Sequence, residues 1–446
     1  MLYLDKSLRF IKKCAILFMV KDMKKEIFNS LIESGELVLD GAMGTSLQKL
    51  GLKAGEKPEL LCLSAPQLVK KVHEDFIKAG ARAIYTNTFG ANRIKLGDKV
   101  EEIIFSAVNI AKEVAGDSVA VLLDLGPTGK LLKPYGELEF ESAYELFLEA
   151  VTAGKNAGAH GVVFETFSSL NELRAAVLAA SQVDLAVFAT MSFEASGRTF
   201  LGVTPSAFAT TIGNMRGVRA IGVNCSLGPK SLAPIVEEIS AFTDLPVIAK
   251  PNAGLPDGDG KYSLDSAEFA KECLELKKKG ASILGGCCGT TPEFIKELNT
   301  LLTAQPLVAK REQKTDAVCS AKRVVELCSL QIEKTEPSQE KKTAIVEAYL
   351  TGDTDYLTEM ALEQEDDGAE IVDLNLSLLS GKGCPLENLE LALTAISSVS
   401  SLPVFIESDD KDILLTALRA FEGRALVKTN CNIENEISLF GSAIKE

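Results

Sequence analysis

Short apolar runs alternate with longer amphipathic segments along roughly the first 300 residues of the chain. Segments 66–79, 143–157 and 267–279 carry apolar residues at a spacing of three to four, which is typical of helices that pack one face on a core. Eight apolar runs are expected to be strands: 37–39, 83–86, 119–125, 161–165, 185–191, 220–224, 246–250 and 281–284. Strands alternating with helices in this way predict an α/β fold and, more narrowly, a (β/α)₈ TIM barrel.

Polar residues interrupt these runs at their carboxyl ends. The position matters because catalytic groups on a TIM barrel come from that end of several strands. The residues concerned are Asp40, Asn87, Thr88, Glu165, Cys225, Asn252, Cys287 and Cys288. Taken alone, Asp40 before Gly41 also suits a plain turn, and Glu165 also suits a cap or a structural ion pair. Their joint placement at one mouth favours a functional site.

Three of these residues are cysteines, and each stands where a strand-like run gives way to a glycine-rich turn. Cys225 lies within 223–229, and Cys287 and Cys288 lie within 284–292. Three thiolates would hold one Zn²⁺ and leave its fourth tetrahedral position free, as in catalytic zinc sites. The glycines beside the vicinal pair permit the bent backbone that such a site requires.

Two plainer interpretations of the cysteines stand beside this one. Free cysteine is often a buried packing residue. We assign that role to the seven scattered cysteines, Cys14, Cys62, Cys273, Cys319, Cys328, Cys384 and Cys431. A vicinal disulfide is the alternative for the adjacent pair, and a reducing cytosol disfavours it.

Length and charge narrow the class of protein. The chain has 446 residues, 46% of them hydrophobic, and suits two or three domains. Its net charge of −15, without a basic cluster, argues against nucleic acid as a partner. The apolar run 14–20 is too short to span a membrane and lacks a small-residue cleavage site, so we expect a cytoplasmic protein, with Met23 as an alternative start.

Histidine contributes little to the expected chemistry. His73 and His160 are the only two in the chain, so neither a histidine-rich metal site nor a Ser/His/Asp triad is favoured. His73 falls in a helical segment and is expected at the surface. His160 precedes the fourth strand, which places it at the end of the barrel away from the chemistry.

A second, shorter region follows the predicted barrel. We expect a barrel domain at 24–304, a polar linker at 305–322 and an α/β domain at 323–446. The last domain contains four strand-like runs: 324–330, 371–374, 404–406 and 425–427. Four strands cannot close a barrel, so an incomplete second β/α barrel with two open edges is expected, with 425–427 at one edge if strand order follows chain order. A partner, a second copy of the chain or the first barrel would cover it.

The motifs of the first domain resemble those of the homocysteine S-methyltransferase family, which includes the homocysteine-binding barrel of cobalamin-dependent methionine synthase. The matching segments are LDGAMGT at 39–45, TNTF at 86–89, GPT at 126–128, ET at 165–166, GVNC at 222–225, KPNAG at 250–254 and GGCCG at 285–289. The wording of 251–256 is closest to the methionine synthase branch. The resemblance implies a zinc-dependent, cytoplasmic methyltransferase of methionine biosynthesis.

The resemblance also implies roles for individual residues. Cys225, Cys287 and Cys288 would be the zinc ligands, with the sulfur of homocysteine at the open position. Glu165 and Asp40 would hold the substrate ammonium. Backbone amides near Gly41 and Thr88 would hold its carboxylate, with Asn87 beside them, and Asn252 would approach the zinc when substrate is absent.

The second domain resembles the beginning of the pterin-binding barrel that follows in methionine synthase. Asp373, Asn375 and Asn430 match pterin-side positions, but Gln331, Ser377 and Glu407 depart from the family pattern. We therefore expect that folate binding is lost.

No cobalamin-module motif is found in the sequence, so methylcobalamin would arrive on a separate protein. The expected reaction is attack of zinc-bound homocysteine thiolate on a methyl donor of the methylcobalamin or methyltetrahydrofolate type. Two alternatives remain open: a methyltransferase for another thiol acceptor, and a non-catalytic or partner-dependent subunit of a corrinoid system. A homo-oligomer formed through the half barrel is a further expectation.

Overall fold

The computed structural model describes residues 37–53, 55–258, 262–304, 316–330, 332 and 337–445. The apolar run 14–20, the alternative start Met23, residues 305–315 of the expected linker and Gln331 lie outside these residues. Within the described part of the chain, no helix combines the length and apolar character needed to cross a bilayer.

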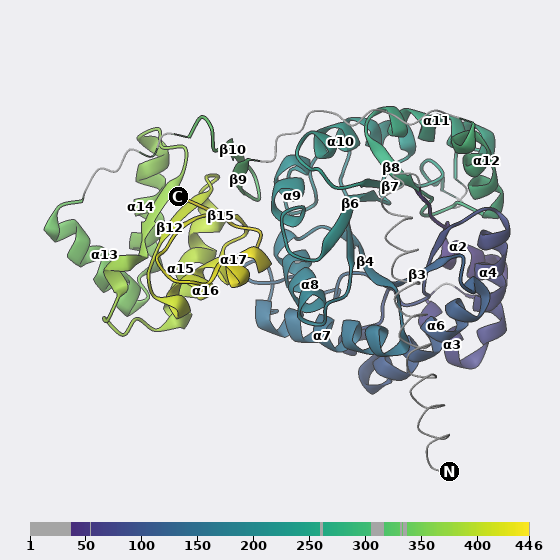
Figure 1. Ribbon diagram of the computed structural model, residues 1–446, viewed down its shortest axis with the longest axis horizontal. Helices are drawn as coiled ribbons and strands as arrows, with labels where there is room; N and C mark the ends of the chain where they lie inside the picture. The colour runs from purple at the N-terminus through teal and green to yellow at the C-terminus, as the bar shows by residue number, and fades with distance from the viewer. Residues whose placement is uncertain are drawn as a thin grey trace, which may run out of the picture.

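The first domain is a closed parallel barrel (Figure 1). Its strands are β1 (Leu37–Val38), β2 (Ala83–Tyr85), β3 (Ala120–Leu125), β4 (Gly161–Phe167), β5 (Val187–Met191), β6 (Val218–Asn224), β7 (Val247–Lys250) and β8 (Ala281–Leu284). They pair in the order β1-β8-β7-β6-β5-β4-β3-β2. A parallel bridge between Leu39 and Ala83 joins the first and last members and closes the ring. The predicted TIM barrel is confirmed, and all eight expected runs contain a strand.

Helices surround the strands on the outside (Figure 1). They are α2 (Met43–Lys49), η1 (Pro58–Leu60), α3 (Leu61–Ser64), α4 (Pro66–Lys78), α5 (Arg93–Leu96), η2 (Gly97–Lys99), α6 (Val100–Ala115), α7 (Phe140–Ala157), α8 (Leu170–Gln182), α9 (Pro205–Ile212), α10 (Pro229–Ala241), α11 (Ser266–Lys278) and α12 (Pro292–Thr303). Local chemistry sets several starts: the side chains of Ser169, Thr204 and Asp265 accept a backbone N–H at the first turns of α8, α9 and α11.

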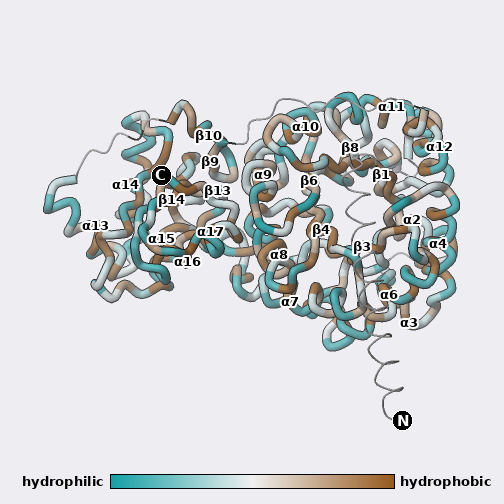
Figure 2. Tube along the Cα trace, in the orientation of Figure 1, coloured by the Kyte–Doolittle hydropathy of each residue, from teal (hydrophilic) through white to brown (hydrophobic). Residues whose placement is uncertain are grey.

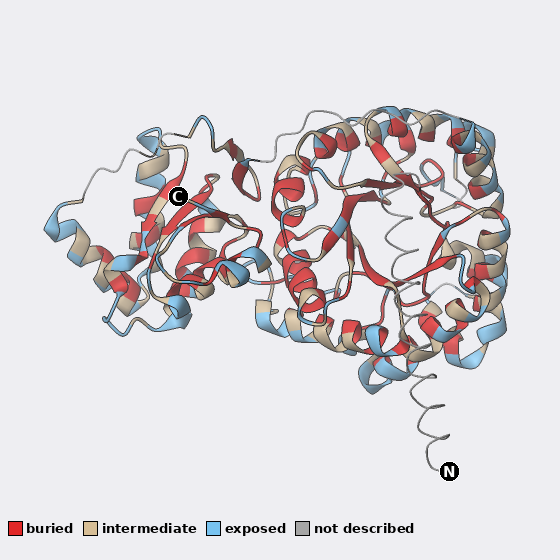
Figure 3. Cartoon of the chain, in the orientation of Figure 1, coloured by how far each residue is buried: buried red, intermediate tan, exposed pale blue. Residues whose placement is uncertain are grey.

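Alternate residues of each strand face the barrel axis or the helices. Side chains facing the axis form a separate apolar cluster that fills the barrel: Leu37, Leu39, Ala83, Tyr85, Ala120, Leu122, Val163, Phe188, Ala220, Ile248 and Ile283. The strands are buried on both faces and apolar along their length (Figures 2 and 3). This cluster is the floor of the functional site, because polar side chains begin one step above it toward the carboxyl ends.

The two histidines lie away from the expected metal centre. His73 on α4 is fully buried, which corrects the expectation that it is at the surface. Burial lowers the pKa of its imidazole to about 4. His160 lies at the amino end of β4, where its Nδ1 accepts the N–H of Val121 at 2.9 Å.

The second domain contains two small sheets. The strands β11 (Val372–Asn375), β12 (Val404–Glu407), β14 (Leu426–Lys428) and β15 (Ala443–Ile444) form a parallel sheet in that order. A three-stranded antiparallel sheet contains β10 (Val324–Glu326), β9 (Ala317–Ser320) and β13 (Gly423–Arg424). The helices are α13 (Gln339–Thr351), α14 (Thr354–Asp366), η3 (Leu376–Leu379), α15 (Leu386–Val399), α16 (Lys411–Ala420) and α17 (Glu434–Leu439).

Three expectations for this domain were wrong in detail. The linker does not extend to residue 322, because β9 occupies Ala317–Ser320. The run 324–330 does not begin the parallel sheet, because β10 turns back antiparallel on β9. The run 425–427 is not at an edge, because β15 pairs with β14 on its open side. Two short strands that the hydrophobic pattern did not show, β9 and β15, account for these differences.

The second domain packs directly on the first barrel. The fully buried Arg174 of α8 donates to the carbonyl of Leu418 at 2.6 Å, and Arg419 forms an ion pair with Glu141 at 2.6 Å. Backbone N–H groups of the barrel at Thr204 and Arg216 donate to carbonyls of Ala321 and Ser438 in the second domain. One side of the half barrel is therefore covered by the first barrel of the same chain.

Candidate metal centre and substrate site

The three cysteines predicted to bind metal converge at the carboxyl end of the barrel. The Sγ atoms of Cys225, Cys287 and Cys288 all lie within 4.8 Å of one another, and those of Cys225 and Cys288 are 3.8 Å apart. Tetrahedral zinc with Zn–S bonds of about 2.3 Å would separate its sulfur ligands by about 3.8 Å. The cluster therefore fits a zinc ion in size, geometry and donor type.

Backbone bonds between neighbouring loops hold the cysteines in place. The N–H of Cys225 donates to the carbonyl of Lys250, and the N–H of Cys287 donates to that of Pro251. Cys225 itself has a φ of +62°, a left-handed conformation that is rare for residues with a side chain. Strain of this kind persists only where surrounding contacts enforce it. The loops are therefore built around the position of the thiols.

Gly289 shows why glycine follows the vicinal cysteines. Its φ is +84°, and a Cβ atom there would lie 2.4 Å from the ring of Tyr262. Any larger residue would displace either that ring or the turn that carries Cys287 and Cys288.

The three thiols share protons unequally. Hydrogen bonds from Cys287 and Cys288 lower the pKa of Cys225 to about 3. Hydrogen bonding to Cys225 raises the pKa of each of the other two, that of Cys288 to about 11. A cation bound between the three sulfur atoms would favour the thiolate form of each.

Asn224 links the metal cluster to neighbouring strands. It is fully buried at the end of β6, and its Oδ1 accepts the N–H of Thr166 at 2.8 Å and the hydroxyl of Thr190 at 2.7 Å. Its Nδ2 donates to Oγ1 of Thr166 at 2.7 Å and contacts Sγ of Cys287 at 3.9 Å. One amide therefore fixes the loop after Glu165 and the metal cluster together.

A polar layer lies directly above the apolar floor of the barrel. On β3, Leu122 faces the barrel axis, and Asp124, two residues later, faces it too. On β4, Val163 and Glu165 face the axis in the same order. On β7 the corresponding residue above the floor is Lys250. The layer combines two carboxylates with one ammonium group inside a barrel that is otherwise apolar at this depth.

Asp40 and Lys250 form a buried ion pair in this layer. Their Oδ1 and Nζ atoms are 3.0 Å apart, and both side chains are almost inaccessible. The other oxygen of Asp40 accepts the N–H of Tyr85 at 2.8 Å, while Nζ of Lys250 lies 3.5 Å from the centre of the Tyr85 ring. Burial raises the pKa of Asp40 despite these contacts. Burial opposes the charge of Lys250, but Asp40 and its other neighbours outweigh it and raise its pKa.

Glu165 and Asp124 lack such partners. Within the described residues, Oε2 of Glu165 and Oδ1 of Asp124 are buried and accept no hydrogen bond. Burial raises the pKa of Glu165 to about 7, against the opposing effect of Lys250. Burial and the nearby charge of Glu165 raise the pKa of Asp124 well above its ordinary value. The site therefore contains two carboxyl groups that would gain from a cation.

The sequence and the structure match known proteins over this site. Residues 37–302 match the family model described as homocysteine S-methyltransferase. The chain belongs to the homocysteine S-methyltransferase family. It is 27% identical over 423 residues to the methionine synthase of Mycobacterium tuberculosis and 28% identical over 430 residues to that of Mycobacterium leprae. Each alignment covers 88% of this chain and 35% of the relative, so the chain spans about a third of the length of these relatives.

Solved structures of a homocysteine methyltransferase share the fold. The oxidised form of MmuM from Escherichia coli aligns with a TM-score of 0.52 and 22% identity, over 60% of this chain and 96% of that one. Its metallated form aligns with a TM-score of 0.54 and 21% identity, over 62% of this chain and 99% of that one. The family's barrel is thus the part of this chain that these structures match.

The remaining predicted substrate residues lie at the same end of the barrel but differ in orientation. Asn87 donates its side-chain amide to the carbonyl of Pro58 at 2.7 Å, and Thr88 bonds to the carbonyl of Asp124 through its hydroxyl. Asn252 is buried, and its Oδ1 accepts no hydrogen bond within the described residues. A Cβ atom at Gly41 would lie 2.7 Å from the ring of Phe76, so the chain passes closely there.

Sequence reasoning missed Lys250, Asp124 and Asn224. Each lies at an axis-facing position above the apolar floor. The alternation of side chains along β3, β6 and β7 would have placed these polar residues on the side of the strand that faces the axis. It was overlooked because these residues are inside the strands rather than in the loops after them.

Exposed apolar side chains lie around the mouth. Phe89, Leu131, Tyr135, Phe200 and Leu255 are each more than a third exposed and belong to loops that follow β2, β3, β5 and β7. Such loops meet at the carboxyl end of the barrel. Their loops lie at the same end of the barrel as the three cysteines, and we call these five side chains the apolar rim.

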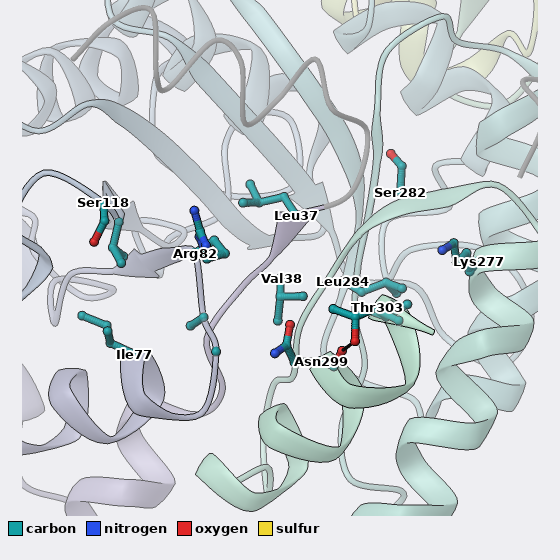
Figure 4. A pocket seen from close by; sticks show the side chains of 14 residues that line it. Leu37, Val38, Ile77, Arg82, Ser118, Lys277, Ser282, Leu284, Asn299 and Thr303 are labelled. Carbon is teal, nitrogen blue, oxygen red and sulfur yellow. Dashed lines mark hydrogen bonds between the residues drawn. The ribbon is translucent and has the colours of Figure 1, made fainter. Parts of the chain in front are cut away.

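A separate cavity of about 580 Å³ lies at the opposite, amino end of the barrel (Figure 4). Strands β1 and β8 and helices α4, α11 and α12 line it, through residues that include Val38, Leu284, Ile77, Lys277 and Asn299. None of the candidate metal or substrate residues lines this cavity.

Proposed function

We propose that the chain is a zinc-dependent homocysteine S-methyltransferase that forms methionine. The observation that carries the proposal is the set of three thiols within 4.8 Å, at the carboxyl end of a barrel of this family. Cys225, Cys287 and Cys288 would hold the zinc. Bound there, zinc would lower the pKa of a substrate thiol from about 8.5 toward neutrality, so that sulfur reacts as thiolate.

The proposed reaction transfers a methyl group from a donor to the sulfur of the substrate. The substrate sulfur forms a bond to the methyl carbon, while the bond from that carbon to the donor breaks and leaves its electron pair on the donor. The polar layer of the barrel orients the amino-acid end of the substrate. Glu165 supports this role because its Oε2 is buried and free of hydrogen bonds within the described residues.

The other substrate contacts are proposed from position. Backbone groups near Gly41 and Thr88 lie beside the ion pair of Asp40, where a carboxylate could be held. The amide N–H of Thr88 already donates to the carbonyl of Thr86, so Gly41 is the stronger candidate of the two. A role for Asn252 beside the metal is supported by its burial and by its Oδ1, which accepts no hydrogen bond within the described residues.

The methyl donor is proposed to be methylcobalamin, carried by a protein domain that docks at the mouth of the barrel. The apolar rim at the mouth supports this, because exposed apolar side chains grouped around a site are typical of interaction surfaces. In the second domain, polar groups at the strand ends are paired with one another: Lys428 with Glu407 at 2.8 Å, and Asn430 with Asp409 at 2.9 Å. That pairing supports the loss of folate binding.

Methyl transfer by the purified chain tests the proposal. Zinc-loaded protein would be offered homocysteine with methylcobalamin, methyltetrahydrofolate or S-methylmethionine, and methionine would be measured. A variant lacking all three cysteine thiols is the matched control and should be inactive. Methylation of a different thiol would support the alternative acceptor. Inactivity with every donor, together with tight binding to a corrinoid protein, would support the non-catalytic subunit.

A further inference from the structure

The ammonium group of the substrate needs a site within the polar layer, and Asp40 is poorly suited to provide it. Both oxygens of Asp40 are engaged, one by Lys250 and the other by the N–H of Tyr85. A substrate ammonium placed against Asp40 would also lie beside the positive charge of Lys250. Like charges at such short range repel, and burial strengthens the repulsion.

Asp124 and Glu165 present the opposite situation. Both project toward the barrel axis from the neighbouring strands β3 and β4, where Asp124 is in register with Val163, two residues before Glu165. Each has a buried oxygen without a hydrogen bond within the described residues. Asp124 is only 7% exposed. A buried carboxylate without a partner is costly, and two close together are costlier still, so a cation between them would remove both penalties.

An ammonium group matches this pair in shape as well as in charge. It offers three N–H donors, and the two free oxygens can accept two of them. Thr88 fixes the strand that carries Asp124, because its hydroxyl donates to the Asp124 carbonyl at 2.7 Å. Asn224 fixes the residue after Glu165 through two hydrogen bonds to Thr166. The backbone at Asp124 and next to Glu165 is therefore fixed by hydrogen bonds to neighbouring strands.

Resting on the proposed function, we infer that Asp124 and Glu165 together bind the ammonium group of the amino-acid thiol, and that Lys250 keeps Asp40 from doing so. Asp124 is then a specificity-determining residue that selects thiols bearing an α-amino group. Lys250 is a positioning residue, because it acts on the substrate through Asp40.

A comparison of two thiols tests the inference. Homocysteine and 4-mercaptobutyrate differ only in the amino group, and calorimetry on the zinc-loaded full chain would give a dissociation constant for each. The wild type should prefer homocysteine. In Asp124→Asn, the loss of one charged hydrogen bond should reduce that preference by about 10- to 100-fold, through weaker binding of homocysteine alone. Zinc content should stay at the wild-type level.

Controls separate a binding role from a structural one. Glu165→Gln should reduce the preference in the same way. If Asp124→Asn unfolds, Asp124→Ser removes the same charge with less crowding and serves the same comparison. An unchanged preference in the Asp124 variant, together with a lost preference in Asp40→Asn, would overturn the inference. A wild-type protein that binds neither thiol would instead overturn the proposed function, which is a distinguishable outcome.

Discussion

The two domains of this chain treat polar groups at the ends of their strands in opposite ways. In the closed barrel, Oε2 of Glu165 and Oδ1 of Asp124 are buried and accept no hydrogen bond within the described residues. In the open sheet of the second domain, Glu407 is paired with Lys428. The difference follows from closure, since a ring of eight strands encloses its carboxyl ends, whereas four strands leave theirs open to solvent.

The difference suits a barrel site that binds a ligand and a second-domain site whose polar groups already have partners within the protein. Unpaired buried polar groups are costly and rare, so their presence in a folded protein calls for an explanation such as a ligand. The barrel holds several around the metal cluster. The second domain resembles a pterin-binding half barrel in sequence, but Glu407 at the end of β12 is paired with Lys428, and strand β15 covers the open side of β14.

Removal of a zinc ligand should have the largest effect on the barrel side of the comparison. Cys287→Ala should lose most of the single zinc ion expected per chain, because two thiolates and a solvent ligand hold zinc far more weakly than three thiolates. Elemental analysis of the purified protein measures this. Cys384→Ala, in the second domain, is the matched control and should keep its zinc. Full zinc occupancy after replacement of all three cysteines would refute the assignment.

The buried His73 should make the stability of the barrel depend on pH. Its pKa is about 4 in the folded chain because burial disfavours the charged form, and the ordinary value is 6.5. Between these values the unfolded chain binds the proton more readily, so the free energy of unfolding falls as pH decreases from 6.5 to 4. The loss should reach about 3 kcal/mol.

Chemical denaturation of wild type and His73→Leu at several pH values measures this contribution. The difference between the two proteins isolates His73 from the carboxylates that titrate in the same range. The same pH slope in both proteins would show that the imidazole is not buried as described.

Glu165→Gln should weaken homocysteine binding by about 1.5 to 3 kcal/mol, the typical value of a charged hydrogen bond. Zinc content should be unchanged. Because the pKa of Glu165 is raised to about 7 by burial, the carboxylate is increasingly protonated below that pH, and wild-type affinity should weaken as pH falls. The ratio of homocysteine to 4-mercaptobutyrate affinity removes the contribution of the thiol. Equal homocysteine affinity in the two proteins would make Glu165 a structural residue.

The second domain should show no effect when offered a pterin. Calorimetry with methyltetrahydrofolate should give no binding in the micromolar range, because Glu407, Lys428, Asp409 and Asn430 already pair with one another. Glu407→Ala is a useful companion, since it frees Lys428 without touching the barrel. Micromolar affinity in the wild type would remove the contrast between the domains.

Much of the barrel could be predicted from local patterns, and much of the second domain could not. The strands of the barrel are buried on both faces, so each one appears as an apolar run. Strands β13 and β15 have only two residues each, too few to form an apolar run of their own. They form because a neighbouring strand has backbone N–H and C=O groups at its edge that are free to make hydrogen bonds.

The sequence by itself determined the order of strands and helices in the barrel and the three cysteines that close on one another. The order of elements follows from the period of apolar residues along the chain. The cysteine site is indicated by the glycines beside the cysteines, where the backbone must turn. Only the tertiary structure decided how charges are shared in the polar layer. Asp40 and Lys250 are 210 residues apart in the chain, and their pairing became visible only when barrel closure brought β1 and β7 to the same mouth. In the same layer, and within the described part of the chain, Asp124 and Glu165 each keep a buried oxygen that accepts no hydrogen bond. The reason is that the free energy of a buried charge depends on its neighbours in space rather than in sequence.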